Sequence, residues 1–148
     1  PFLFPVTFIL LCLFTSCNSG EIVLDHANVN AHKDLRWDLD STLLVISGSN
    51  TISSKEAIPF KAGKYVISFK AYGSVAGDGA LPLFIIDIGD SLLIKQTGIA
   101  VEEKIYTVKF ELQEAITGIL NFTFPNDYAD AGGDRNVYLY FPIRVSEF

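Results

Sequence analysis

A short segment near the C-terminus concentrates the residues that could bind a metal ion. Asp127, Asp130 and Asp134 lie within residues 126–136, beside two adjacent glycines at 132 and 133. Ca²⁺ relieves the repulsion among such carboxylates because it takes about six to eight oxygen ligands, and positive φ at the glycines would turn the backbone carbonyls inward. The segment therefore predicts a calcium site. An ordinary surface turn is the competing interpretation, since Asp, Asn and Gly are also common turn residues.

The sequence around these aspartates resembles the motif of a known family. Residues 126–128 read Asn-Asp-Tyr, and residues 133–139 read Gly-Asp-Arg-Asn-Val-Tyr-Leu. This pattern resembles the signature of the calcium-dependent xylan-binding carbohydrate-binding modules of family 60, which have family 36 as circularly permuted relatives. The resemblance extends over most of residues 58–145, where residues 60–67 and 77–83 are similar to the family's Gly-Tyr strand and its proline-containing strand entry.

The resemblance implies both a site and a mode of binding. In that family the loop holds Ca²⁺, and two vicinal sugar hydroxyls complete the coordination shell. By resemblance, Asp127 and Asp134 are side-chain ligands, and a backbone carbonyl near Tyr128 is a third ligand. Asp130 falls in the variable gap of the motif and is a further candidate ligand, while Tyr128 stands where the family often has Trp. The residues expected to contact the glycan are Asn126, Tyr128, Asp130 and Asp78.

The first 17 residues have the features of an export signal. They are largely apolar, and no charge precedes Glu21. Such a run is typical of a secretory leader and is shorter than the roughly 20 apolar residues of a membrane-spanning helix. Residues 13–17, ending at Cys17, resemble a bacterial lipoprotein processing box, which implies a lipid anchor and a place on the cell surface or outer membrane. A plain leader and a secreted protein are the alternative. Because the chain has no methionine, its natural start is expected upstream of Pro1.

Composition and motifs argue against several classes of function. Both cysteines, at 12 and 17, lie in the leader, which excludes a disulfide framework or a cysteine nucleophile in the folded part. The net charge of −6 argues against nucleic acid as a partner, because phosphates would be repelled. No Gly-x-Ser-x-Gly, P-loop or His-Glu-x-x-His motif occurs. Asp127 and Asp134 could form a glycosidase pair, but a cation between them would lower both pKa values, whereas the acid needs a raised one. No enzyme is expected.

Hydrophobic residues alternate with polar ones along most of the remaining chain. The alternation is clearest in residues 65–72, 106–112, 120–124 and 137–143, and residues 81–88 and 91–95 predict a hairpin. We therefore expect an all-β fold, an antiparallel β-sandwich of the jelly-roll type with about eight to nine strands. The expected organisation is a signal peptide at 1–17, a tether and irregular edge at 18–41, and the sandwich at 42–148. Trp37 is expected in the core, with sugar stacking as the alternative.

Two functions remain compatible with these observations. The first is a non-catalytic, calcium-dependent module that binds xylan or a related polysaccharide and is displayed on, or exported across, a bacterial envelope. The second is a structural or assembly protein in which calcium only stabilises a loop, and whose sheet edge near residues 138–142 associates with other copies.

Overall fold

The structure is a sandwich of two antiparallel sheets. The computed structural model describes residues 20–31, 35–89 and 92–148, and within these ranges every regular element is a strand. The larger sheet has the order β10 (Lys104–Leu112), β7 (Gly63–Gly73), β15 (Val137–Glu147), β4 (Leu43–Ile46) and β3 (Arg36–Trp37), and β1 (Ile22–Leu24) also pairs with β15. The smaller sheet has the order β2 (Val29–Asn30), β5 (Asn50–Ser54), β12 (Leu120–Phe124), β8 (Leu83–Ile88) and β9 (Leu92–Gly98). The predicted all-β antiparallel sandwich is confirmed.

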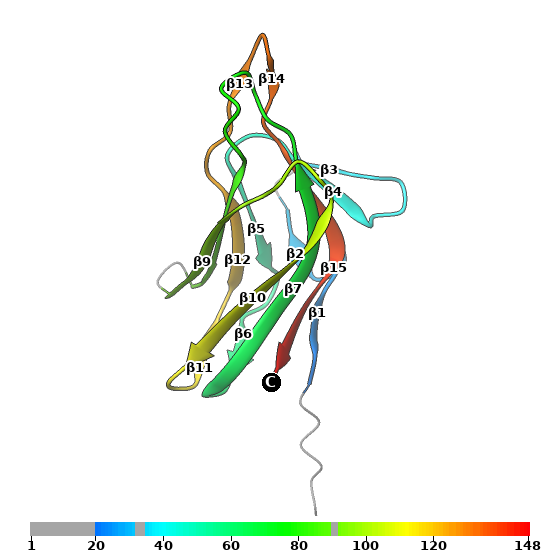
Figure 1. Cartoon of the computed structure of the whole chain (residues 1–148). Helices are drawn as coiled ribbons and strands as arrows, with labels where there is room; N and C mark the ends of the chain where they lie inside the picture. The colour runs from blue at the N-terminus through cyan, green and yellow to red at the C-terminus, as the bar shows by residue number, and fades with distance from the viewer. Residues whose placement is uncertain (1–19, 32–34, 90–91) are drawn as a thin grey trace, which may run out of the picture.

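Two short ribbons complete the fold. β6 (Ile58–Phe60) pairs with β11 (Ile116–Gly118), and β13 (Ala129–Asp130) pairs with β14 (Gly133–Asp134). Figure 1 shows the β13–β14 ribbon projecting from the upper end of the sandwich, whereas β1 and the C-terminus lie toward the lower end. A loop that follows β7 lies beside the projecting ribbon. The acidic segment at residues 126–136 therefore lies at the end of the molecule away from both β1 and the C-terminus.

The core lies between the sheets and follows the predicted alternation. Inward-facing residues of β7, β12 and β15 are buried, while most residues between them are more accessible to solvent. Asn121 is the exception in β12, because it is buried as well. Phe69 contacts Phe84 and Phe122 across the sandwich, with ring centroids 5.8 and 6.2 Å apart, and it stacks on Tyr106 at 5.2 Å. Burial of large aromatic rings dominates the stability of such a core. The two sheets are therefore held by packing that does not involve the projecting ribbon.

The region N-terminal to residue 42 contributes more to the sandwich than expected. β1 pairs with residues 143–145 of β15, β2 pairs with β5, and β3 pairs with β4. All three strands are two or three residues long, too short to show an alternation pattern in the sequence. The sandwich thus extends to Ile22, within the range expected to be a tether and edge. With these strands, the larger sheet has six strands and the smaller sheet has five. The sandwich therefore has more strands than the eight to nine expected.

Trp37 lies at this N-terminal edge rather than in the centre of the core. Its ring is partly buried and contacts His26 and Phe141, each with a centroid separation of 4.8 Å. The ring is thus a packing residue, as the first interpretation held. The peptide bond between Phe141 and Pro142 is cis. It lies where the pairing of β15 with β7 is irregular, between Tyr140 and Arg144.

The predicted hairpin is present as β8 and β9, which pair antiparallel with a register shift between Ile86 and Asp87. Its turn residues, 90 and 91, lie outside the described ranges. The expected signal peptide and Cys17 also lie outside them. Within the described ranges, no helix is long and apolar enough to cross a membrane.

Candidate functional site

Residues 74–80 and 126–136, hereafter the tip, form the candidate site. The two segments lie in close contact, and glycines make this approach feasible. A Cβ on Gly132 would lie 2.6 Å from the Cα of Gly77, and a Cβ on Gly133 would lie 2.8 Å from the carbonyl oxygen of Val75. Gly133 has the predicted positive φ, at 150°, whereas Gly132 is not among the residues with positive φ. Position 132 requires glycine because a side chain there would collide with the backbone of Gly77.

Asp130 holds the two segments of the tip together. Its Oδ1 atom accepts hydrogen bonds from the backbone N–H groups of Gly77, at 2.9 Å, and Gly132, at 2.8 Å. A carboxylate that accepts backbone N–H bonds forms stronger hydrogen bonds than a neutral acceptor does. The structure therefore gives Asp130 an organising role, and any metal at this carboxylate would share it with two N–H donors.

Arg135 is the central residue of the tip. Its side chain is buried, with 4% of the residue exposed. Nε donates to the carbonyl oxygen of Ala80 at 3.0 Å, and Nη1 donates to that of Asn126 at 2.7 Å. Nη2 forms an ion pair with Asp78, and the guanidinium carbon lies 5.5 Å from the centroid of the Tyr128 ring. One buried cation thus joins three residues expected to contact glycan.

Asp78 and Asn126 are engaged within the protein. The hydrogen bond from Arg135 is the main cause that lowers the pKa of Asp78 below its ordinary value, and the backbone N–H of Ala80 adds to it. The Asn126 side chain accepts from the N–H of Leu83 at 2.7 Å and donates to the carbonyl of Leu81 at 3.0 Å. Both predicted glycan contacts therefore shape the tip, and Asn126 fixes the entry to β8.

The backbone register of the β13–β14 ribbon indicates on which of its two faces each remaining side chain lies. Ala129 pairs with Asp134, and the Arg135 N–H donates to the Tyr128 carbonyl at 2.9 Å, so the pairing continues beyond β13 and β14. Because successive side chains alternate between faces, Tyr128 and Arg135 share one face. Continued to residue 127, the same alternation assigns Asp127 to the other face, with Asp134 and Asn136.

This second face carries the oxygen atoms that are least engaged. Asp127 and Asp134 are exposed. Asp134 Oδ2 accepts one hydrogen bond, from Asn136 Nδ2 at 2.9 Å. Asn136 is buried, with 8% exposed, and its Oδ1 atom has no hydrogen-bond partner among the described residues. A buried polar atom without a partner is uncommon and calls for an explanation.

These residues fit a calcium ion in part. Two carboxylates and an unpartnered amide oxygen on one face are the hard oxygen donors that Ca²⁺ prefers. The described residues contain no group of three or more His, Cys, Asp or Glu side chains able to hold a metal. The expectation that Asp127, Asp130 and Asp134 converge on one ion is therefore wrong for this structure. The Tyr128 carbonyl, the expected third ligand, already accepts the Arg135 N–H. Asn136 was not expected from the sequence, because only the fold shows that its amide oxygen is buried.

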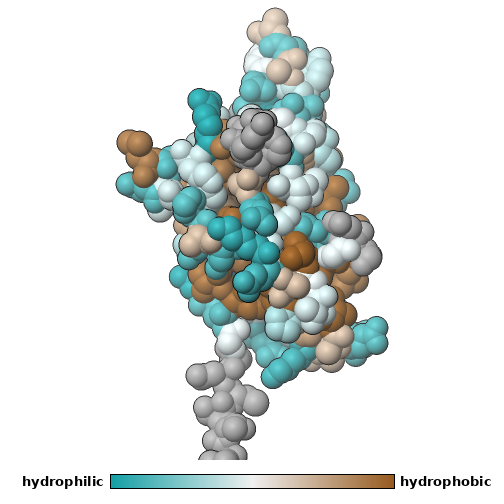
Figure 2. Space-filling view, turned by 180° about the vertical axis from the view of Figure 1, so that it is seen from behind, coloured by the Kyte–Doolittle hydropathy of each residue, from teal (hydrophilic) through white to brown (hydrophobic). Residues whose placement is uncertain are grey.

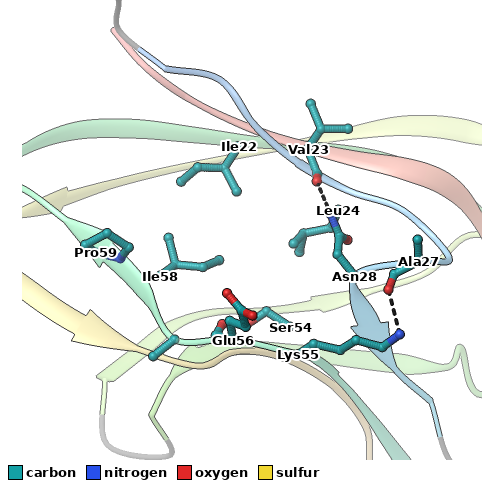
Figure 3. Close-up of a pocket in the computed structure, with 11 residues that line it drawn as sticks. Ile22, Val23, Leu24, Ala27, Asn28, Ser54, Lys55, Glu56, Ile58 and Pro59 are labelled. Carbon is teal, nitrogen blue, oxygen red and sulfur yellow. Dashed lines mark hydrogen bonds between the residues drawn. The ribbon is translucent and has the colours of Figure 1, made fainter.

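A cavity elsewhere in the molecule has a different character. It has a volume of about 480 Å³ and lies between β1 and the segment that joins β5 to β6, away from the tip (Figures 1 and 3). Ile22, Leu24, Ile58 and Pro59 surround it in Figure 3. Lys55 and Glu56 are its charged lining residues, and Lys55 Nζ donates to the carbonyl of Ala27 at 2.6 Å. This lining is mainly apolar, so we assign it no role in glycan binding.

Comparisons with known proteins show similarity of fold. No family model and no curated protein matches the sequence. Among solved structures, the C-terminal CBM6 of LamC, a laminarinase from Zobellia galactanivorans, is 11% identical, with a TM-score of 0.60 over 86% of this chain and 100% of that one. The CBM36-1 domain of a multidomain xylanase from the hindgut metagenome of Trinervitermes trinervoides is 8% identical, with a TM-score of 0.58 over 87% of this chain and 98% of that one. A family two carbohydrate esterase from Cellvibrio japonicus is 8% identical, with a TM-score of 0.53 over 86% of this chain and 33% of that one. The chain therefore has a β-sandwich fold that carbohydrate-binding modules also have.

Proposed function

We propose that this domain is a non-catalytic module that binds polysaccharide at the tip with the help of Ca²⁺. The observation that carries the proposal is the contact between exposed Asp134 and buried Asn136, whose Oδ1 atom has no partner among the described residues. The strand alternation assigns exposed Asp127 to the same face. The fold shared with carbohydrate-binding modules supports the choice of ligand class. The proposed ligand is xylan or a related neutral glycan, and the proposed setting is the outside of a bacterial cell, with Cys17 as a lipid anchor.

Hydrogen bonds within the protein connect the two segments of the tip. Arg135 and Asp130 join residues 126–136 to residues 74–80 through hydrogen bonds that the protein makes by itself. An ion at this tip would therefore not have to order the loop, and more of its binding free energy would remain for ligand capture. When bound, Ca²⁺ would supply coordination positions that two neighbouring sugar hydroxyls can occupy.

The geometry also supports a non-catalytic role. A glycosidase needs one carboxyl group with a raised pKa to protonate the leaving group. At the tip, Arg135 lowers the pKa of Asp78, so Asp78 remains ionised and cannot act as that acid near neutral pH. Binding without turnover is the simpler use of this surface.

Affinity electrophoresis in gels that contain xylan tests the proposal. The wild-type domain should be retarded in Ca²⁺ and run freely in excess EDTA. Asp127→Ala and Asp134→Ala should each abolish retardation while circular dichroism shows an intact sandwich. Asp40→Ala is the matched control, because it removes an exposed aspartate outside the tip. Retardation that is unchanged in EDTA would disprove the calcium dependence, and retardation of both tip variants would disprove the residue assignment.

A further inference from the structure

Three tyrosines lie together on the outer face of the larger sheet. Tyr72 on β7 is directly opposite Tyr138 on β15, and Tyr140 follows two residues later on the same face. Their neighbours in the strands, Ala71 and Leu139, are fully buried, so the alternation of the pleat turns the tyrosines outward. Each tyrosine is half-buried. We call Tyr72, Tyr138 and Tyr140 the tyrosine face.

The rings of the tyrosine face are close and ordered. Tyr72 and Tyr138 stack with centroids 4.4 Å apart and planes 3° from parallel, and Tyr140 lies 6.3 Å from Tyr72. Lys70 Nζ lies 4.5 Å from the centroid of Tyr140 and 2.6 Å from Glu103 Oε1. The Tyr140 hydroxyl donates to the Glu103 carboxylate, a contact that raises the pKa of Tyr140 to about 12. These contacts fix the orientation of Tyr140.

Stabilisation of the sheet is the simplest role for such rings, because cross-strand aromatic pairs strengthen antiparallel sheets. The outer face of the smaller sheet provides a comparison, because its strands also have outward-facing cross-strand pairs. There, Thr51 bonds Thr123 at 2.9 Å and Ser53 bonds Asn121 at 2.7 Å. Figure 2 views the molecule from behind and shows hydrophilic and weakly hydrophobic side chains on that side, together with several strongly hydrophobic patches. At these positions of the smaller sheet, small polar pairs therefore stand where the larger sheet has tyrosines.

The tyrosine face is continuous with the tip. Ser74 and Asn136 lie two residues beyond Tyr72 and Tyr138 along the two strands. They are joined by a hydrogen bond from the Asn136 N–H to Ser74 Oγ at 3.0 Å and one from the Ser74 N–H to the Asn136 carbonyl at 3.0 Å. Two residues of a strand span about 7 Å. A polysaccharide held beside Asn136 would therefore reach the Tyr72–Tyr138 pair within one or two sugar units.

We propose that the tyrosine face binds successive pyranose rings of a neutral polysaccharide and extends the tip site along the larger sheet. This inference rests on the proposed function and deepens it. Pyranose C–H groups carry partial positive charge and are attracted to the negative faces of aromatic rings, so the rings rather than their hydroxyl groups would make the contact with the sugar. A neutral chain is favoured over a charged one because the lysine at this face, Lys70, is already paired with Glu103.

The test compares four variants of the full domain by affinity electrophoresis on soluble xylan and mixed-linkage β-glucan, each with Ca²⁺ and with EDTA. Tyr72→Ala and Tyr138→Ala remove the stacked rings. Tyr138→Phe retains the ring and removes only the hydroxyl. Thr107→Ala is the matched control, since it truncates an exposed outer-face residue of β10 opposite Ser68. Calcium titration by calorimetry and light scattering are measured on each variant.

The expected result is an affinity about three- to tenfold weaker for both alanine variants. Tyr138→Phe and Thr107→Ala should bind as the wild type does, and calcium affinity should be unchanged in all four. If the alanine variants bind glycan normally, the tyrosine face is not a subsite, although the tip can still be one. If the alanine variants change only the oligomeric state, the face is a contact between copies and the proposal is wrong.

The comparison between Ca²⁺ and EDTA distinguishes this inference from the proposed function. Binding that survives EDTA but weakens in Tyr72→Ala and Tyr138→Ala would uphold the tyrosine face and disprove the calcium site. A wild-type domain that binds neither glycan under either condition would overturn both proposals.

Discussion

Arg135 and Asp78 are 57 residues apart in the chain and form an ion pair at the tip. The arginine is buried, while 44% of the aspartate side chain is exposed. The pair joins the loop after β7 to the end of the β13–β14 ribbon, next to the two backbone carbonyls that the same guanidinium binds. The shape of the tip therefore depends on one buried cation.

Arg135→Ala should destabilise the domain by about 2 kcal/mol, because it removes several hydrogen bonds to a buried charged group. Arg144→Ala is the matched control. Arg144 pairs with Glu21 at 2.7 Å, but both side chains are about half exposed, so its loss should cost under about 1 kcal/mol. Urea unfolding of the two variants beside the wild type measures the difference. Equal midpoints for the two variants would show that burial of Arg135 contributes nothing.

Acidic pH should loosen the tip. Because the pKa of Asp78 is lower in the folded state than its ordinary value of 3.8, the unfolded chain binds the proton more readily, and stability falls as pH drops through and below 3.8 toward the folded pKa. Above that window the stabilisation is fully present. Asp78→Asn should remove this contribution, so the melting temperatures of variant and wild type should converge as the pH is lowered from 6 to about 3. A constant difference over that range would contradict the assignment.

Gly132→Ala should disrupt the tip, since the added Cβ would lie 2.6 Å from the Cα of Gly77. Backbone atoms cannot give way as a flexible side chain can, and overpacking of this kind costs about 1–3 kcal/mol. Gly98→Ala is the control, because its Cβ would meet Leu81 at an ordinary 3.5 Å. The melting temperature and the retardation by xylan should both decrease for Gly132→Ala and stay unchanged for Gly98→Ala. Normal retardation by this variant would show that glycan binding does not depend on the packing of residue 132 against residue 77.

Calcium should raise the melting temperature of the wild-type domain. A ligand that binds only the folded state stabilises it by about 2.7 kcal/mol at a hundredfold excess over its Kd. Asp134→Ala should lose this shift, and Asn136→Ala should reduce it if the unpartnered Oδ1 atom is a ligand. Scanning calorimetry in Ca²⁺, Mg²⁺ and EDTA measures the effect. A wild-type melting temperature that is the same in all three buffers would rule out an ion at the tip.

The sandwich was predictable because its signal is local. Alternation in β7, β12 and β15 identifies which side chains face the core, and each strand shows it independently of the others. The same is true of the β8–β9 hairpin, whose strands are neighbours in the chain. The short strands β1, β2 and β3 were not predicted, because two or three residues cannot establish a period.

The tip was predicted in its location but not in its contacts. The motif identified Asp127 and Asp134, and Asp130 in its variable gap was a further candidate ligand. In the structure, Asp130 instead accepts a hydrogen bond from the N–H of Gly77. Arg135 was missed, since nothing in its sequence neighbours indicates that it is buried.

The sequence by itself determined the class of fold, the faces of its long strands and the concentration of acidic residues near the C-terminus. The tertiary structure alone decided that Asp78 meets Arg135, that Asn136 Oδ1 is buried without a partner, and that Tyr72 stacks on Tyr138. The reason is physical. Alternation reports which face a side chain occupies, whereas contacts between residues far apart in the chain depend on which strands pair and in what register, and that is set by packing of the whole core.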